Sequence, residues 1–399
     1  MHSSPGPSPP PMPPGQNGDD MCIDIIEPYL IHIKDLTLSD NMPRTEMPGK
    51  IDICVLTHLR CVRIFTPVFA TLPAIQLLMG FPDLRELLLN FEFSADTQAA
   101  LAGTGLAPGF FELHELNLSA SFEDIAIFLD ATEPVGLESL TLARSGQFHR
   151  HQGGAQIVQD IHAAYAKIPR HVRGLHLHLT GDHHYFDGDE RSLPELAASQ
   201  ILPEALRTLP DIEELTVTYS SLGASVTDDE LVTFSTVWPA LTRFEFNSTL
   251  WKHRHGSNEH HFRDYNALLK LSTLLAFTSA HPHLIQLSLP ALGPEGIPQL
   301  DIRLHVPFRA HETSSHGMRL LRLNTVAPET PVVALAIALD CVFRRLELGH
   351  PGTVTVDNMN MKAGYLWNGP PPELSLTGED VLMTLLLALQ TAWNMGGMV

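Results

Sequence analysis

The stretch Phe81-Pro82-Asp83-Leu84-Arg85-Glu86-Leu87-Leu88-Leu89 contains a phrase that recurs along the whole chain. With x for any residue, it reads aromatic-Pro-x-Leu-x-x-Leu-x-Leu. Closely similar phrases stand at 209–217, 238–246 and 281–289. A self-similar phrase spread over hundreds of residues is typical of a repeat architecture. This phrase therefore decides how the rest of the chain is interpreted.

The shorter core of the phrase, apolar-x-x-apolar-x-apolar, recurs about eleven times. The intervals between successive starts run from 24 to 43 residues, and the longer intervals indicate inserted loops. The starts are Ile33, Leu59, Leu84, Leu113, Leu137, Val172, Ile212, Leu241, Leu284, Met318 and Phe343.

Each phrase predicts one β-strand, because its last two apolar residues alternate with period 2 and so share one face. The first apolar residue closes the turn that leads into the strand, and the preceding proline stops the helix before it. Ser121 and Thr227, each followed by acidic residues, are predicted helix N-caps. Helices are expected over 68–79, 122–131, 155–166, 228–237 and 263–280.

Regular alternation of strand and helix predicts an α/β solenoid of ten or eleven irregular repeats. A curved parallel sheet would line the concave side and helices would lie outside. Three segments follow: a disordered Pro/Ser-rich leader at 1–20, the repeat domain at 21–376 and a C-terminal helical cap at 377–399. Within the leader, 7–10 fits P-x-x-P, the ligand pattern of SH3-type domains, but a plain flexible leader is the favoured interpretation.

Composition narrows the possible partners and the compartment. The chain has 399 residues, 44% of them hydrophobic, and a formal net charge of −20. Such an acidic balance argues against nucleic acid or an anionic membrane as the partner. The cysteines Cys22, Cys54, Cys61 and Cys341 form no CxxC pair and favour buried, reduced thiols. No signal peptide or membrane-spanning run is visible, so a cytoplasmic or nuclear location is expected.

The phrases resemble leucine-rich repeats of the irregular intracellular kind. The run Tyr29 to Leu38 and the P-x-L-x-x-L-x-L phrases at 82–89, 210–217 and 239–246 resemble fungal F-box proteins. This resemblance implies the substrate-recognition part of a ubiquitin-ligase receptor, which would bind a Skp1-type adaptor through its F-box. The alternative is that the chain is a stand-alone repeat scaffold or inhibitor without a ubiquitin role.

Two features depart from that family. Its helical F-box should precede residue 29, but only the leader and Met21 to Glu27 stand there, and no F-box is identified. Regular leucine-rich repeats also carry Asn or Cys three residues after the last Leu. Here that position holds Glu92, Ser121 and Ser145 in successive repeats, among others.

No pattern supports catalysis, and no cofactor is predicted. His311-Glu312 with His316 resembles the H-E-x-x-H zinc motif, but the second histidine comes one residue late and would lie on another helix face. Histidines gather at 182–190 and 252–261, where they could hold a metal, but flexible polar insertions are the favoured interpretation and no metal site is predicted. A hydrolase that uses these loops is a distant alternative, and the chain is expected not to be an enzyme.

The remaining candidate is the concave face of the sheet, where a solenoid commonly docks a protein partner. Residues that alternate with the inward leucines should line this face. They are Glu86, Asn90, Glu115, Asn117, Thr141, His176, His178, Glu214, Thr216, Arg243, Glu245, Ser288, Arg322 and Glu347.

Overall fold

The computed structural model describes most of the repeat region. The described residues are 34–38, 58–67, 70–104, 106, 109–144, 154–180, 196–197, 202, 204–207, 209–220, 224–248, 269–290, 292–293, 295, 317–323, 332–343 and 354–356. The predicted leader at 1–20 and the predicted cap at 377–399 both lie outside them.

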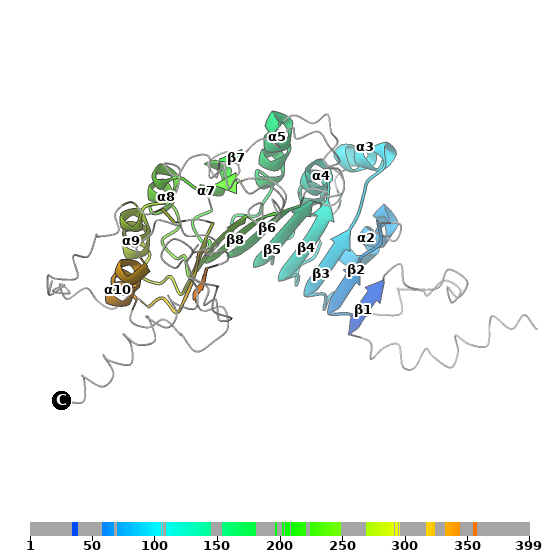
Figure 1. Ribbon diagram of the computed structural model, residues 1–399. Helices are drawn as coiled ribbons and strands as arrows, with labels where there is room; N and C mark the ends of the chain where they lie inside the picture. The colour runs from blue at the N-terminus through cyan, green and yellow to red at the C-terminus, as the bar shows by residue number, and fades with distance from the viewer. Residues whose placement is uncertain are drawn as a thin grey trace, which may run out of the picture.

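One parallel sheet runs through the described molecule, with its eleven strands in the order of the sequence. Figure 1 shows it as a continuous arch. The strands are β1 (Asp35–Leu38), β2 (Cys61–Ile64), β3 (Glu86–Asn90), β4 (Glu115–Ala120), β5 (Ser139–Arg144), β6 (Gly174–Thr180), β8 (Glu214–Ser220), β10 (Arg243–Ser248), β11 (Gln286–Leu289), β12 (Leu320–Leu323) and β13 (Val354–Val356). A separate pair, β7 (Leu196–Ala197) and β9 (Ala224–Ser225), forms a small second sheet.

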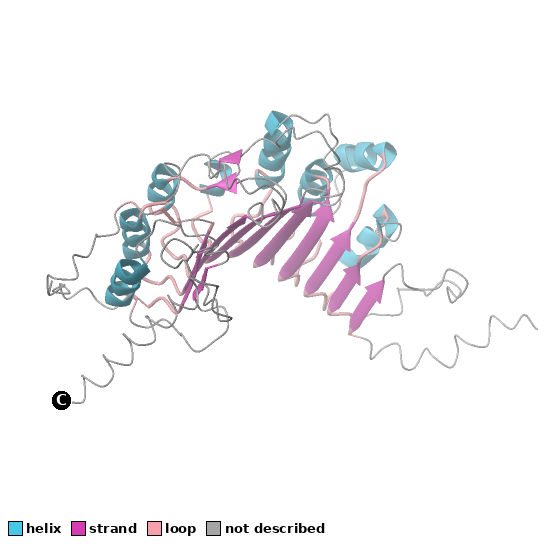
Figure 2. Cartoon of the chain, in the orientation of Figure 1, coloured by secondary structure: helices cyan, strands magenta, loops and turns pink. Residues whose placement is uncertain are grey.

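All helices of the described residues lie on one side of the main sheet, on the outside of the arch (Figure 2). They are α2 (Leu72–Met79), α3 (Ala95–Thr104), α4 (Phe122–Thr132), α5 (Gly154–Tyr165), α7 (Glu204–Arg207), α8 (Asp228–Phe234), α9 (Leu271–Ala280) and α10 (Val332–Val342). This arrangement confirms the predicted α/β leucine-rich-repeat solenoid. The sequence had not predicted α3, α7 and α10.

The predicted N-caps are confirmed by their hydrogen bonds. Ser121 Oγ accepts the backbone N–H of Asp124 at 3.1 Å. Thr227 and Glu230 form a capping box, in which Thr227 Oγ1 accepts the Glu230 N–H and the Glu230 carboxylate accepts the Thr227 N–H. Each contact satisfies backbone donors that the first turn of a helix otherwise leaves unpaired.

The apolar residues of each phrase form columns beneath the helices. In β3, Leu87 and Leu89 are fully buried while their neighbours Glu86 and Leu88 are half-buried. The first apolar residue of the phrase, such as Leu84, is also buried. Because the side-chain period of a strand is 2, this alternation separates a core face from an open face, although Cys61 of β2 and Ser288 of β11 are buried on the open face.

A repeated backbone contact aligns the strands at the edge where they begin, which we call the N-terminal edge. The carbonyl of Lys34 accepts two consecutive N–H groups of the next repeat, Arg60 at 2.8 Å and Cys61 at 3.0 Å. Arg60 then accepts from Arg85 and Glu86 in the same way. Nine such carbonyls recur among the described residues, from Lys34 to Ile285. Together they hold every strand from β1 to β12 in one register.

The core changes from leucine to aromatic residues at two places along the solenoid. Phe234 packs against Trp238 and Phe244 with ring centroids 5.7 and 6.3 Å apart, and Phe244 packs on Phe277 at 5.3 Å. A second group surrounds Phe128, between β3, β4 and α4. In both groups the aromatic side chains are buried between the sheet and its helices.

The last strand of the sheet, Val354–Val356, pairs with β12 and was not predicted from the sequence. The eleventh phrase begins at Phe343, and the strand that it predicts over the next residues lies outside the described residues. Phe343 is fully buried at the end of α10, where its N–H donates to the Leu339 carbonyl. Phe343 therefore anchors the end of α10 in the core.

The register predicts very different effects for two adjacent substitutions in β5. Leu140 is fully buried, so Leu140→Ala should lower the free energy of unfolding by about 2–5 kcal/mol. Thr141 faces the open side, and Thr141→Ala should cost about 0.5 kcal/mol. Urea unfolding of both purified variants measures the difference. Equal losses would contradict the assignment of the two faces.

Candidate functional site

Strand register arranges the open face into rows of side chains that cross the sheet. The first row takes the first residue of each strand, and the second row takes the third residue. The first row runs Asp35, Cys61, Glu86, Glu115, Ser139, Gly174, Glu214, Arg243, Gln286, Leu320. The second row runs Thr37, Arg63, Leu88, Asn117, Thr141, His176, Thr216, Glu245, Ser288, Arg322.

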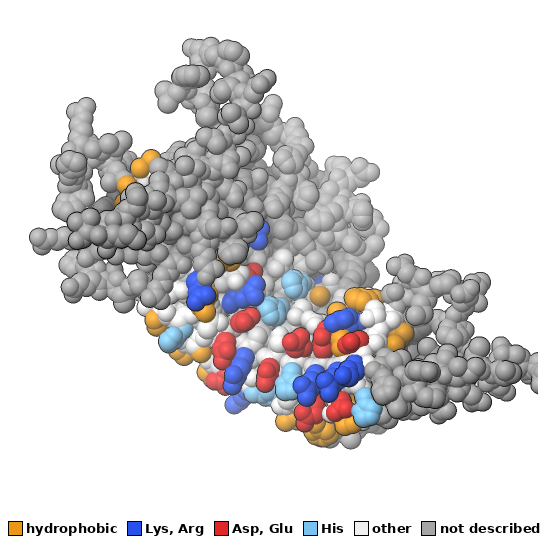
Figure 3. All heavy atoms as spheres, turned by 90° about the horizontal axis from the view of Figure 1, so that it is seen from below, with side chains coloured by type: hydrophobic (Ala, Val, Ile, Leu, Met, Phe, Trp, Pro, Cys, Tyr) orange, Lys and Arg blue, Asp and Glu red, His pale blue; other side chains and the backbone are white. Residues whose placement is uncertain are grey.

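The structure brings together almost all the residues that the sequence predicted for this face. Glu347 lies outside the described residues, and the other thirteen stand on the open face in these rows or in a third row that contains Asn90, His178 and Asn247. Their shared face follows from the strand period, while their role in binding stays a prediction. Seen from this side, the face carries acidic, basic and histidine side chains without one dominant charge (Figure 3).

One predicted residue has a structural role as well. The Asn90 side-chain amide donates to the backbone carbonyl of Phe65 in the preceding repeat, at 2.9 Å. In regular repeats, the asparagine ladder makes this kind of contact, in which a side-chain amide forms a hydrogen bond with the backbone of a neighbouring loop. Asn90 makes it once, two residues earlier in the repeat than the expected position, Glu92.

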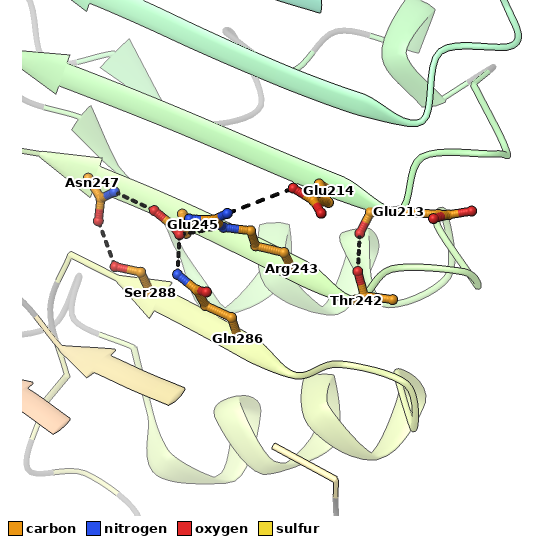
Figure 4. A network of polar contacts seen from close by, with 8 residues as sticks. All are labelled: Glu213, Glu214, Thr242, Arg243, Glu245, Asn247, Gln286 and Ser288. Carbon is orange, nitrogen blue, oxygen red and sulfur yellow. Dashed lines mark hydrogen bonds and ion pairs between the residues drawn. The ribbon is translucent and has the colours of Figure 1, made fainter. Parts of the chain in front are cut away.

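A network of polar contacts joins β8, β10 and β11 on the open face (Figure 4). Its centre is the Glu245 carboxylate, which accepts from Arg243 Nε at 2.7 Å and from Asn247 Nδ2 at 3.3 Å. Gln286 Nε2 of the neighbouring strand also donates to it. Ser288 Oγ then donates to Asn247 Oδ1 at 2.6 Å, which extends the network along β11.

The network fixes a charged group in a shielded place. The Glu245 side chain is only 12% exposed, whereas Arg243 remains 39% exposed and also approaches Glu214 at 3.8 Å. A shielded carboxylate is stabilised when several donors satisfy it, and it then holds those donors in place. The part of Arg243 that reaches solvent is therefore presented in a defined orientation.

Two histidines on β6 stand beside this network. His176 and His178 are separated by one residue and point to the same face, with Thr216 beside His176 on β8. Burial lowers the pKa of His176, and the nearby Glu214 carboxylate opposes this only in part. Burial also lowers the pKa of His178. Both imidazoles are consequently neutral at pH 7 and act there as hydrogen-bonding groups rather than cations.

At the other end of the sheet, the face contains an ion pair and a thiol. Arg63 donates through Nη2 at 2.7 Å and through Nε at 3.1 Å to Glu86 Oε1. Cys61 is buried beside this pair, and burial, followed by the Glu86 charge, raises its pKa to about 11. A thiol that stays protonated at neutral pH is a poor nucleophile and a poor metal ligand.

The described residues offer no site for a metal. No group of three or more His, Cys, Asp or Glu among them is placed to hold an ion. The histidine-rich loops at 182–190 and 252–261 and the motif at 311–316 lie outside the described residues. Within the described part of the chain, no helix is long and apolar enough to cross a membrane.

Comparisons with known proteins add little to this geometry. No family model matches the chain, and no curated protein matches it. Among solved structures, the chain is similar to an internalin (inlF) from Listeria monocytogenes, at 13% identity over 75% of this chain and 83% of that one. The TM-score is 0.31, so this likeness carries no weight for fold or function.

The network predicts that Glu245 matters more to stability than an exposed glutamate does. Glu245→Gln removes the charge that Arg243 and Gln286 point at, and should lower the free energy of unfolding by about 1–3 kcal/mol. Glu138, 64% exposed and 3.5 Å from His114, is the control, and Glu138→Gln should change it by about 0.5 kcal/mol or less. Urea unfolding at pH 7 tests both, and a silent Glu245→Gln would argue against the network.

Proposed function

We propose that this chain is a non-catalytic interaction module that binds a protein partner on the open face of its sheet. The observation that carries the proposal is the continuity of that face. Rows of mostly polar side chains cross ten strands in register, with Thr216 and Ser288 buried among them, and in the described part of the chain every helix lies on the other side. Extended concave surfaces of this kind are what stacked repeats offer to large partners.

The energetics of the face also support a binding role. Its polar groups are held by contacts within the face, as in the Glu245 network and the Arg63–Glu86 pair. Groups that are ordered before binding lose less entropy when a partner docks. Neutral residues such as Asn117, Thr141 and His176 lie between the two charged ends, so a partner that covers the centre meets mainly neutral groups.

The finer proposal concerns the role that this interaction module has in the cell. The resemblance of the repeats to fungal F-box proteins leads us to propose the substrate-recognition part of a ubiquitin-ligase receptor. Nothing in the described geometry favours an enzyme, since the face lacks a metal-holding group among the described residues and its buried thiol is protonated. A scaffold or inhibitor without a ubiquitin role is the alternative.

A matched pair of substitutions tests the open face. Asn117 is half-buried at the centre of the second row, and Asn117→Arg places a long cation there. Gln159, exposed on α5, gives the control Gln159→Arg on the helical side. The wild-type chain is used to capture partner proteins, which are identified by mass spectrometry. Their affinity for the Asn117→Arg variant should be at least about tenfold weaker than for the wild type, and their affinity for the Gln159→Arg variant should be unchanged. Equal binding by both variants would rule out this face.

The finer proposal is tested by direct binding of the purified, folded chain to a Skp1-type adaptor. We expect a stable complex by size-exclusion chromatography if the chain acts as a receptor. A well-folded protein that does not bind the adaptor, yet still captures a partner through the open face, would favour the scaffold or inhibitor instead.

A further inference from the structure

Three basic residues stand side by side at the N-terminal edge of the first three strands. Lys34, Arg60 and Arg85 immediately precede β1, β2 and β3, and all three are exposed. The Arg60 N–H donates to the Lys34 carbonyl and the Arg85 N–H donates to the Arg60 carbonyl, each at 2.8 Å. The three side chains therefore leave the backbone at successive strand spacings of roughly 4.8 Å. We call them the basic edge.

Nearby carboxylates are directed elsewhere. Glu86 binds Arg63 on the open face, at 2.7 Å. Asp35 forms no ion pair within the described residues, either with Lys34 beside it or with Arg60 just before the next strand. Asp83 contacts His58 at 3.2 Å. Within the described residues, none of the three cations of the basic edge forms an ion pair.

The arrangement is unusual for this chain. The protein has 25 Lys and Arg against 45 Asp and Glu, so basic residues have many acidic groups available to them. Like charges on neighbouring strands repel each other and destabilise the sheet. Three neighbouring cations that form no ion pair within the described residues are suited to an anionic ligand.

We propose that the basic edge binds a short acidic, extended peptide segment of a partner protein. From Lys34 to Arg85 the row spans two strand spacings, about 10 Å, which equals roughly three residues of extended chain. Arginine forks bind carboxylates through paired hydrogen bonds and give such contacts geometric specificity.

A short segment fits better than a long polyanion. The Debye length at physiological salt is about 8 Å. The three cations therefore attract only those anionic groups that lie in direct contact with them. Beyond the row, a nucleic acid would meet a protein of net charge −20. An acidic segment of a few residues is attracted by the three cations and is too short to reach the acidic surface beyond them.

This site is separate from the open face. The basic edge precedes the strands, whereas the face is formed by residues within them. An acidic segment could dock there whether or not the open face binds a partner, and the substitutions that test the two surfaces do not overlap.

The experiment uses the full chain and a fluorescein-labelled Glu-rich peptide, with its Gln counterpart as the control peptide. Fluorescence anisotropy should show binding of the Glu-rich peptide only, weakening as salt rises. The double variant Arg60→Gln/Arg85→Gln should lose at least about tenfold in affinity, because two charge-assisted contacts are removed. Lys34→Gln should lower the affinity for the peptide only a few-fold, which is the effect expected from the loss of a single exposed ion pair.

Arg170 supplies the matched control. It is exposed in the turn before β6, at the same edge of the sheet, and forms no ion pair within the described residues. Arg170→Gln should leave binding unchanged. The proposal is overturned if the Glu-rich peptide does not bind, if Arg170→Gln weakens binding as much as the double variant, or if a single-stranded DNA oligonucleotide binds the basic edge more tightly than the peptide.

Discussion

The bifurcated backbone contact at the N-terminal edge is the constraint on which the other features depend. One carbonyl accepts two successive N–H groups of the next repeat, as Lys34 does from Arg60 and Cys61. Because the contact recurs between neighbouring strands from β1 to β12, it prevents any strand from slipping by one residue relative to its neighbour. A slip of one residue would exchange the two faces of a strand and expose its leucines. Shared register therefore keeps the apolar columns continuous beneath the helices and the polar rows continuous above them.

Shared register also converts residues far apart in sequence into neighbours. Glu245 and Gln286 are 41 residues apart, yet their strands adjoin and their side chains meet on the open face. His176 and Thr216 become adjacent in the same way although a long interval separates them. The inserted loops thus lengthen the chain between repeats without disturbing the order of the rows. A face of this kind can change its surface chemistry residue by residue while its frame stays the same.

Charge is distributed unevenly over this frame. At the β10 end and the β2 end of the open face, arginines are neutralised by carboxylates of the same or the next strand. The centre carries fewer charges, because burial keeps His176 and His178 unprotonated at pH 7. The basic edge differs from both, since its cations are not neutralised within the described residues. Two surfaces of different chemistry therefore lie close together near β2 and β3, one suited to a broad polar contact and the other to a small acidic group.

The sequence by itself determined the repeat architecture, ten of the eleven strands, the two N-caps at Ser121 and Thr227, and the set of residues that share the open face. Periodicity carries this information, because the side-chain direction in a strand depends only on local backbone geometry. Only the tertiary structure decided which side chains meet across strands, that α3 and α10 exist, and that Val354–Val356 pairs with β12. Those outcomes depend on contacts between segments separated by loops of variable length. No local pattern contains the distance between two such segments, so the pairing of Glu245 with Gln286 and the alignment of Lys34, Arg60 and Arg85 become visible only once the strands are stacked in register.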